Sequence, residues 1–403
     1  MKLLKTLLFI FNAFIVFHAH SSLLKQGPWR GQLILNDSTL ISFSFSVNEN
    51  DHLILRNADE RITLKEFKLK GDSLLYPFPI YQTYLIFKTR NNNSIEGYFV
   101  NPDRKKHSKV KLVAKHLEKS KFTDSIKTSK KNINGNWHVT FSPNTKSSYP
   151  AIGKFEQQKN GRVTGTFLTE TGDYRFLEGK LKNDSLVLSC FDGSHLFLFN
   201  AKIIDNELHG SFYSGSHWYT NWIAKRNPSF HLAHPDSLTT FVGDTFHFKH
   251  PDLENNIYQF PNEETIGKVT IVQIMGTWCP NCLDESNFYK QLYENYHVEG
   301  LEIIAIAYEY PKTFDKQVAR VNHYLEYKKL PYPVLIGGHA SKQEASADFN
   351  MLSKISSFPT SIFINRKGEV VKIHTGFSGP GTGEIYNDYV KKTELLIEKL
   401  LIE

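Results

Sequence analysis

Cysteine is scarce in this chain, whose 403 residues include only three. Cys190 stands alone, whereas Cys279 and Cys282 form a pair separated by two residues. So few cysteines cannot staple a chain of this length, which excludes the class of small disulfide-rich exported scaffolds. The close pair therefore predicts a chemical role for these two cysteines and not a structural one. Cys190 lies on the same alternating face as Leu186 and Leu188, which predicts an inert thiol in a core.

Long apolar runs and long runs of one charge are also missing. After the N-terminus, no stretch approaches the 20 or so apolar residues that are needed to span a bilayer. The formal net charge is +7, but 48 lysines and arginines are scattered among 41 acidic residues and form no basic stripe. The composition thus argues against nucleic-acid binding and against an integral membrane protein.

Residues 1–20 are typical of an export signal. Lys2 and Lys5 precede a short apolar run over residues 7–17, and Ala19 offers a small residue for cleavage. No cysteine follows the run, so a lipid-modified N-terminus is not expected. We predict a mature protein in the periplasm or cell envelope, soluble or peripheral to the membrane. Cleavage of the signal and its retention as an anchor both stay open.

A repeated pattern occupies the first half of the chain. Its short segments of alternating hydrophobicity are separated by Gly, Asn and Asp turns, which predicts an almost all-β region. Four landmarks recur in the same order about 110 residues apart, and this indicates one unit written twice, over residues 27–116 and 132–226. The landmarks are GPW and GNW, LKGDSL and LKNDSL, IEGYF and LHGSF, and the segments that end at Lys115 and Lys225.

Each unit of about eight strands suits a small antiparallel barrel or sandwich and resembles lipocalin-like modules. Two linkers are predicted, over the Lys- and Ser-rich residues 117–131 and over the Pro-containing residues 227–240. From residue 241 to 403, strand and helix patterns alternate, which predicts an α/β domain with a mixed sheet and helices on both faces. The predicted strands are 269–274, 301–307, 333–336, 361–365 and 369–374, and the predicted helices are 282–297, 313–327, 341–352 and 384–400.

The motif that carries chemistry is GTWCPNCLDE, residues 276–285, where a buried strand gives way to a helix. Cys279 falls at the helix N-terminus, where unpaired N–H groups and the helix dipole favour a thiolate, so it is the predicted attacking sulfur. Cys282 lies one turn later and is the predicted resolving thiol, because the two sulfurs can close a disulfide. Pro280 suits the first turn, where its missing N–H would have no partner.

The final 160 or so residues resemble the TlpA/ResA-type branch of the thioredoxin superfamily, which is found in bacterial cell envelopes. The WCPNC segment matches the WCxxC active site of that family, and Phe358-Pro359-Thr360 matches the place of a cis-proline that faces the disulfide. Glu285 and Glu309 match two family glutamates, and Glu285 would take or return a thiol proton. The implied catalytic residues are Cys279, Cys282, Glu285 and Pro359, and the implied substrate-contacting residues are Trp278, Pro280, Phe358 and Glu309.

The resemblance implies a protein-disulfide reductase that uses the cysteine pair, with no metal and no other cofactor. Exported thiol or disulfide proteins such as apocytochromes would be its clients, and a membrane-bound thiol reductant would be its electron donor. The chain departs from many family members by placing Pro280 after the first cysteine instead of a proline before the second. Because these residues help to set the reduction potential, the direction of electron flow stays open.

Other interpretations compete with this one. A zinc site needs a second pair of Cys or His ligands, which the sequence lacks, and copper delivery needs wider cysteine spacing. Asp284 and Glu285 can be acids that stabilise a helix start, and Glu309 can be a solvated strand-end residue. A thiol peroxidase is disfavoured because Thr277 lies two residues before Cys279, not three. The main competing function is a binding protein whose β units capture a ligand and whose thioredoxin-like fold is a scaffold.

Overall fold

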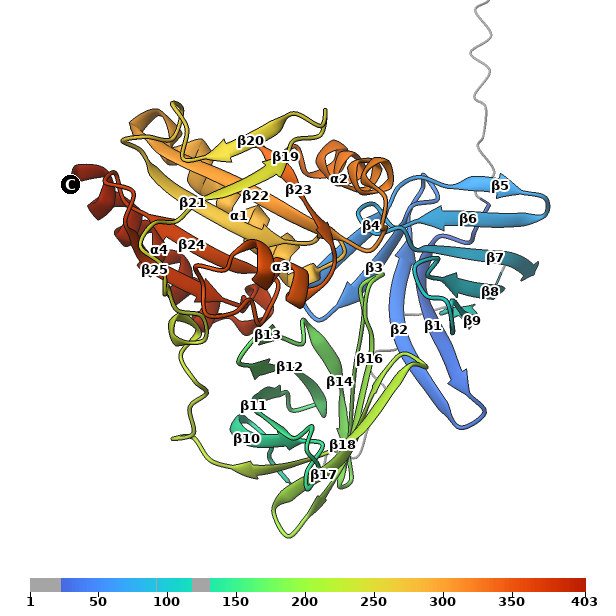
Figure 1. The fold of residues 1–403 in the computed structure, drawn as a ribbon. Coiled ribbons are helices and arrows are strands. Elements are labelled where there is room, and N and C mark those ends of the chain that lie inside the picture. Colours follow the sequence, from blue (N-terminus) through green and yellow to red (C-terminus); the bar gives the residue numbers. More distant parts are fainter. Residues whose placement is uncertain (1–22, 92, 118–130) are drawn as a thin grey trace, which may run out of the picture.

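The computed structural model describes residues 23–91, 93–117 and 131–403, which form two β regions and an α/β region (Figure 1). The predicted export signal and most of the predicted linker over residues 117–131 lie outside the described residues. In the part of the chain that is described, no helix is long and apolar enough to cross a membrane.

The first β region is a nine-stranded antiparallel sheet in the order β4-β3-β2-β1-β9-β8-β7-β6-β5. Buried residues alternate with more exposed ones along β2 (Thr39–Val47), as a period-two pattern requires, and the buried set faces a single core. The other strands are β1 (Gly27–Asn36), β3 (Leu53–Asn57), β4 (Glu60–Leu64), β5 (Lys68–Lys70), β6 (Ser73–Pro77), β7 (Tyr84–Asn91), β8 (Ser94–Val100) and β9 (Lys109–His116).

The second β region is a closed barrel. Its sheet runs β11-β10-β18-β17-β16-β15-β14-β12-β13, and an additional pairing of β11 with β12 joins the two sides. The strands are β10 (Gly135–Phe141), β11 (Tyr149–Gln157), β12 (Arg162–Thr169), β13 (Gly172–Asp173), β14 (Leu177–Lys182), β15 (Ser185–Phe191), β16 (Leu196–Ile204), β17 (Glu207–Ser214) and β18 (Trp218–Arg226). The buried Cys190 lies in this barrel's core, as predicted.

Both regions are all-β, as predicted, but the first is an open sheet and not a complete barrel or sandwich. Its edge strands β4 and β5 do not pair with each other in the described residues, so the sheet remains open. The second region covers the open side instead: Phe191, Leu196 and Leu198 belong to the core of the first sheet. The ring of Phe191 lies edge-on to Phe43 and Phe99, with centroids 4.8 and 5.2 Å away. Burial of these side chains covers apolar surface on the open side of the sheet.

Matching contacts explain the repeated landmarks. The indole N–H of Trp29 donates to the carbonyl of the residue four positions earlier at 2.9 Å, and Trp137 makes the same bond at the same distance. A Cβ at Gly97 would lie 2.0 Å from a carbonyl oxygen on the neighbouring strand, and one at Gly210 would lie 2.2 Å from another. Both sites require glycine because strands approach closely there.

The C-terminal region has the predicted mixed sheet, in the order β23-β22-β21-β24-β25. The three strands β21 (Val269–Met275), β22 (Leu301–Glu309) and β23 (Val334–His339) are parallel, and β24 (Thr360–Ile364) and β25 (Val370–Thr375) complete the sheet in antiparallel pairings. A hairpin of β19 (Phe248–Pro251) and β20 (Ile257–Phe260) precedes this sheet. The sequence did not predict the hairpin.

Helices cover both faces of this sheet, as predicted. On one face, α1 (Pro280–Tyr296) contacts both α2 (Phe314–Lys328) and α4 (Glu384–Ile402) through hydrogen bonds. The hydroxyl of Tyr308, which points to the opposite face, donates to Asp348 in α3 (Lys342–Asp348) at 2.7 Å. The helix α3 is shorter than predicted, because Phe349 leaves the helical conformation and stacks on Phe246, 5.9 Å away.

The segment over residues 227–240, predicted as a linker, is docked on the C-terminal sheet. Asp236, in the short 3-10 helix Pro235–Ser237, accepts a hydrogen bond from His374 at 2.6 Å, and Thr239 accepts one from Thr375 at 2.8 Å. The approach to the C-terminal region is thereby fixed by specific polar contacts on β25.

Candidate active site at the start of helix α1

The local sequence places two cysteines at the junction of β21 and α1. Every residue of β21 is buried, and the chain then turns through Gly276 into α1. Cys279 is the N-cap of the helix, with an extended backbone, and its Sγ accepts the N–H of Cys282 at 3.2 Å. Pro280 occupies the first turn, where a missing N–H costs nothing. The thiol therefore takes the place of the oxygen of a conventional N-cap residue.

The two sulfurs lie in different surroundings. Cys279 is 7% exposed and lines a cavity, whereas Cys282 is fully buried. Burial raises the pKa of Cys282 well above its usual range, and its contacts with Cys279 and the nearby carboxyl of Glu285 raise it further. A reactant that enters the cavity meets Cys279, whereas Cys282 can act only from below it.

A cis-proline lies beside the first sulfur. The Phe358–Pro359 peptide bond is cis, as predicted from the resemblance. The carbonyl oxygen of Phe358 lies 3.5 Å from the Cys279 Sγ, and that of Pro359 accepts the N–H of Gly376 at 2.8 Å. The backbone before β24 thus forms one wall next to the thiol.

Both predicted glutamates are buried, which contradicts the alternative interpretation of Glu309 as a solvated strand-end residue. Glu285 is 0% exposed in the second turn of α1, where it accepts hydrogen bonds from Gln273 at 2.8 Å and from Tyr289 at 3.2 Å. Burial raises the pKa of Glu285 to about 8 despite these donors. Glu309 accepts two bonds of 2.8 Å from the backbone and hydroxyl of Thr277, and burial raises its pKa to about 7. Both carboxyls therefore exchange protons near neutral pH.

Aromatic rings form a second wall. The indole N–H of Trp278 donates to the carbonyl of Tyr308 at 2.9 Å, which holds the ring against Tyr310 and Phe358, with centroids 4.7 and 5.9 Å away. Trp278 and Pro280 line the cavity, as their predicted role requires. Phe358 and Glu309 do not line it but support residues that do.

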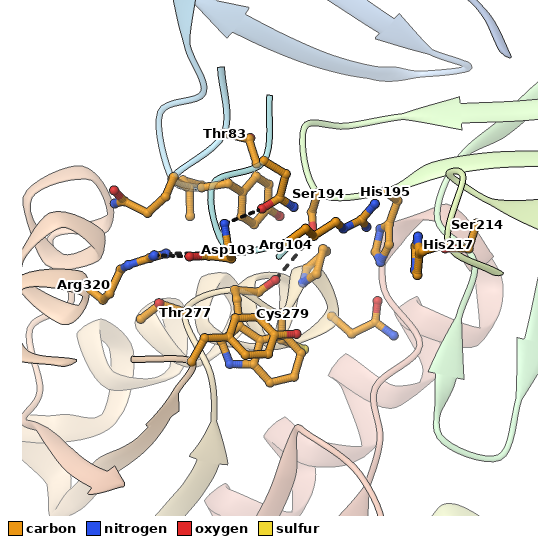
Figure 2. A pocket seen from close by; sticks show the side chains of 18 of the residues that line it. Thr83, Asp103, Arg104, Ser194, His195, Ser214, His217, Thr277, Cys279 and Arg320 are labelled. Carbon is orange, nitrogen blue, oxygen red and sulfur yellow. Dashed lines mark hydrogen bonds and ion pairs between the residues drawn. The ribbon is translucent and has the colours of Figure 1, made fainter. Parts of the chain in front are cut away.

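All three regions of the chain enclose the cavity in front of Cys279, whose volume is about 490 Å³ (Figure 2). The β regions supply its far side, with side chains 60 or more residues distant in sequence from the cysteines. Sequence reasoning missed this contribution, since most of these residues lie in loops and none belongs to a motif. They are Ile80, Tyr81, Gln82, Thr83, Asn101, Asp103, Arg104, Asp173, Ser194, His195, Ser214 and His217.

A buried ion cluster joins the same three regions. Arg175 of the barrel contacts Glu60 of the first sheet at 2.6 Å, Asp192 of the barrel at 3.5 Å, and Asp284 of α1. Asp284 is therefore an interface residue, not a simple helix-start acid. Burial raises its pKa to about 7, although Arg175 opposes that rise.

The C-terminal part of the chain matches a known protein family. Residues 241–389 match the Redoxin family model. The thiol-disulfide oxidoreductase ResA of Halalkalibacterium halodurans is 29% identical over 162 residues, which are 40% of this chain and 78% of that protein. The thioredoxin-like protein YneN of Bacillus subtilis is 26% identical over 114 residues, 28% of this chain and 60% of that protein.

Solved structures also align with this part of the chain. A thiol:disulfide interchange protein of Chlorobium tepidum covers 39% of this chain with 94% of its own, at 20% identity and a TM-score of 0.29. StoA of Bacillus subtilis covers 36% of this chain with 98% of its own, at 22% identity and a TM-score of 0.26.

Proposed function

The C-terminal region is a TlpA/ResA-like domain of the thioredoxin superfamily, and on this premise we propose that the chain is a thiol-disulfide oxidoreductase that reduces disulfides through Cys279 and Cys282. One observation carries the proposal: the Sγ of Cys279 faces a cavity beside a cis-proline, while Cys282 is buried one turn below it. This arrangement separates the sulfur that attacks from the sulfur that resolves.

The reaction follows from these positions. The Cys279 thiolate attacks one sulfur of a substrate disulfide, forms a mixed disulfide and releases the other sulfur as a thiolate. Cys282 then loses its proton and attacks the Cys279 sulfur, which releases the second substrate thiolate. Two electrons have passed from the dithiol to the substrate, and the Cys279–Cys282 pair is left as a disulfide. A thiol reductant must restore the dithiol before the next cycle.

The proposal also includes the location of the protein, its clients and its electron donor. We place the protein in the cell envelope, exported by residues 1–20, with exported thiol or disulfide proteins as clients and a membrane-bound thiol reductant as electron donor. The two β units, over residues 27–116 and 132–226, act in client selection, because their loops form the far wall of the cavity in front of Cys279. In this proposal the β units bind the client, as in the alternative interpretation of a binding protein, and they do so at the same site where Cys279 reduces it.

A thiol count across a redox titration tests the proposal. We expect alkylation after denaturation to find three thiols in the reduced protein and one in the oxidised protein, with the same difference of two in a Cys190→Ala variant. A midpoint near that of thioredoxin, about −270 mV, supports a reductase, whereas one near that of DsbA, about −120 mV, contradicts that direction. Retention of all thiols at every potential would overturn the redox function itself.

Glu285→Gln tests the proton transfer. The amide can keep partners among Gln273 and Tyr289, so the helix should stay intact, but it cannot accept the proton of Cys282. We expect turnover to fall about 100-fold at pH 8, the magnitude typical of a lost general base. Because the pKa of Glu285 is about 8, the carboxylate form grows as pH rises from 7 to 9. The wild-type rate should level off as pH approaches 9, whereas the rate of the variant should stay lower and continue to rise with the thiolate fraction of Cys282.

A matched measurement separates chemistry from folding in this variant. Alkylation of Cys279 precedes the step that needs Glu285, so its rate should change less than twofold. An equal loss in alkylation and in turnover would instead assign Glu285 a structural role.

A further inference from the structure

We propose that the cavity selects disulfides that carry a carboxylate close to the disulfide bond, and that Arg104 binds that carboxylate. The inference rests on the proposed redox function and specifies its substrate class. It follows from how the cavity is covered, which of its charges are already paired, and where Arg104 points.

The β regions cover the thiol closely. Ser194 donates to the carbonyl of Trp278 at 3.5 Å, and the carbonyl of Thr171 accepts a hydrogen bond from Ser357, next to the cis-proline loop, at 3.2 Å. Gly172 bridges to Phe377 on the other side of that loop. The remaining volume of about 490 Å³ is in the range of small-molecule sites. A small disulfide or one extended peptide segment fits this space, whereas a folded domain does not.

Most charges along the cavity are already matched. Asp103 forms a two-pronged pair with Arg320 of α2, which ties the first sheet to the C-terminal domain. The Asp173 carboxylate accepts the backbone N–H groups of Arg175 and Gly379, each at 2.6 Å. The ring of His195 is bound to Asp192 at 3.0 Å. None of these groups needs a charge from the substrate.

Arg104 differs from them. Its guanidinium forms no ion pair with a carboxylate of the described residues. Figure 2 shows its side chain extending from the first sheet toward His195 and His217. Burial lowers the pKa of Arg104, and a half-buried cation without a counter-charge favours an anionic ligand. Burial also lowers the pKa of His217, to about 4, so that ring is neutral at pH 7 and adds a hydrogen-bonding group but no charge.

Arg104 and Cys279 line the same cavity. Burial raises the pKa of Tyr310 to about 12, Cys279 raises it as well, and Arg104 acts in the opposite direction. The phenol, which also lines the cavity, therefore lies within electrostatic range of both groups. A carboxylate held by Arg104 would place a nearby disulfide over the Cys279 Sγ. The two-electron exchange then proceeds as described above, with the substrate leaving as two thiols.

Three small disulfides of different charge test the inference: dithiodipropionate is anionic, hydroxyethyl disulfide is neutral and cystamine is cationic. With dithiothreitol as reductant, we expect kcat/KM of the full-length protein to be about tenfold higher for dithiodipropionate than for cystamine. Arg104→Gln should remove most of that ratio, with a much smaller loss on the neutral disulfide. Lys105→Gln, which removes an exposed charge from the same loop, should leave the ratio unchanged.

Two outcomes separate the inference from its premise. If wild type reduces all three disulfides but Arg104→Gln keeps the ratio of wild type, the carboxylate site is wrong and the redox function stands. If wild type reduces none faster than dithiothreitol alone, the proposed function fails as well. Where the preference depends on Arg104, two disulfide-linked peptides that differ by Glu or Gln beside the cysteine show whether the natural carboxylate belongs to a protein or to a small molecule. A preference for Glu that depends on Arg104 assigns the site to protein segments, and a preference confined to small disulfides assigns it to small molecules.

Discussion

Cys279→Ser is expected to lower dithiothreitol-driven disulfide reduction to the rate of dithiothreitol alone. The hydroxyl cannot act as the attacking thiolate, and the buried Cys282 has no access to the cavity. The fold should survive, because Ser is among the best N-cap residues and its oxygen can accept the Cys282 N–H that the sulfur now accepts. The loss is therefore chemical, and an unchanged thermal unfolding midpoint would document that.

Cys282→Ser is the informative partner of this variant. It retains the attacking sulfur but lacks the thiol that releases the substrate, so a mixed disulfide on Cys279 should accumulate to about one per chain. Mass spectrometry without reductant detects it, and Cys190→Ala, a change in the barrel core at a residue that does not line the cavity, should behave as wild type. Turnover by Cys279→Ser at the wild-type rate would remove the basis of the proposed function.

Periodicity predicted the elements of the C-terminal domain because it records local burial. The wholly apolar run of β21 and the amphipathic pattern of α4 each bury a face whatever the rest of the chain does. The cysteine pair and Pro359 were predicted because they belong to short motifs at element boundaries. Glu309 was harder to judge, since its burial depends on Thr277 in another element, which sequence spacing does not reveal.

The enclosure of the site could not be predicted in the same way. Arg104 and Ser194 lie in loops, and their approach to Cys279 depends on how three regions dock on one another. The open first sheet has the same origin, since Phe191 enters its core from the barrel, a separate region of the chain. Repeated landmarks predict that two units share strands. They do not predict that one unit closes while the other is completed by its neighbour.

Arg175 is expected to be the side chain on which this docking most depends. It is 5% exposed and faces carboxylates from all three regions: Glu60, Asp192 and Asp284. Its backbone has a φ of +62°, a conformation that costs a non-glycine residue about 1–2 kcal/mol. Burial alone lowers the pKa of Arg175, but the three carboxylates reverse that effect and raise it. The three carboxylates therefore keep Arg175 charged in the interior, and the charge of Arg175 in turn stabilises these buried carboxylates.

Arg175→Met should destabilise the assembly of the three regions by about 3–5 kcal/mol at neutral pH, because it leaves buried carboxylates without a cation. Thermal unfolding should separate into two transitions, and limited proteolysis should cut between the regions. Arg320→Gln is the matched control: it too removes an ion pair between two regions, here the first sheet and the C-terminal domain, but one that is more exposed, so about 1 kcal/mol or less is expected. Equal effects of the two variants would contradict a special role for Arg175.

The stability loss in Arg175→Met is expected to depend on pH in a definite direction. Burial raises the pKa of Asp284 to about 7, above its unfolded value of 3.8, so the folded protein holds a proton that the unfolded chain releases. Its contribution to stability is complete below pH 4, declines as pH rises, and levels off above pH 7. Without Arg175 the pKa of Asp284 rises further, so the decline should continue above pH 7. The difference in unfolding midpoint between Arg175→Met and wild type should thus be smallest near pH 5 and grow toward pH 8, and a constant difference would show that Arg175 stabilises the interface by packing alone.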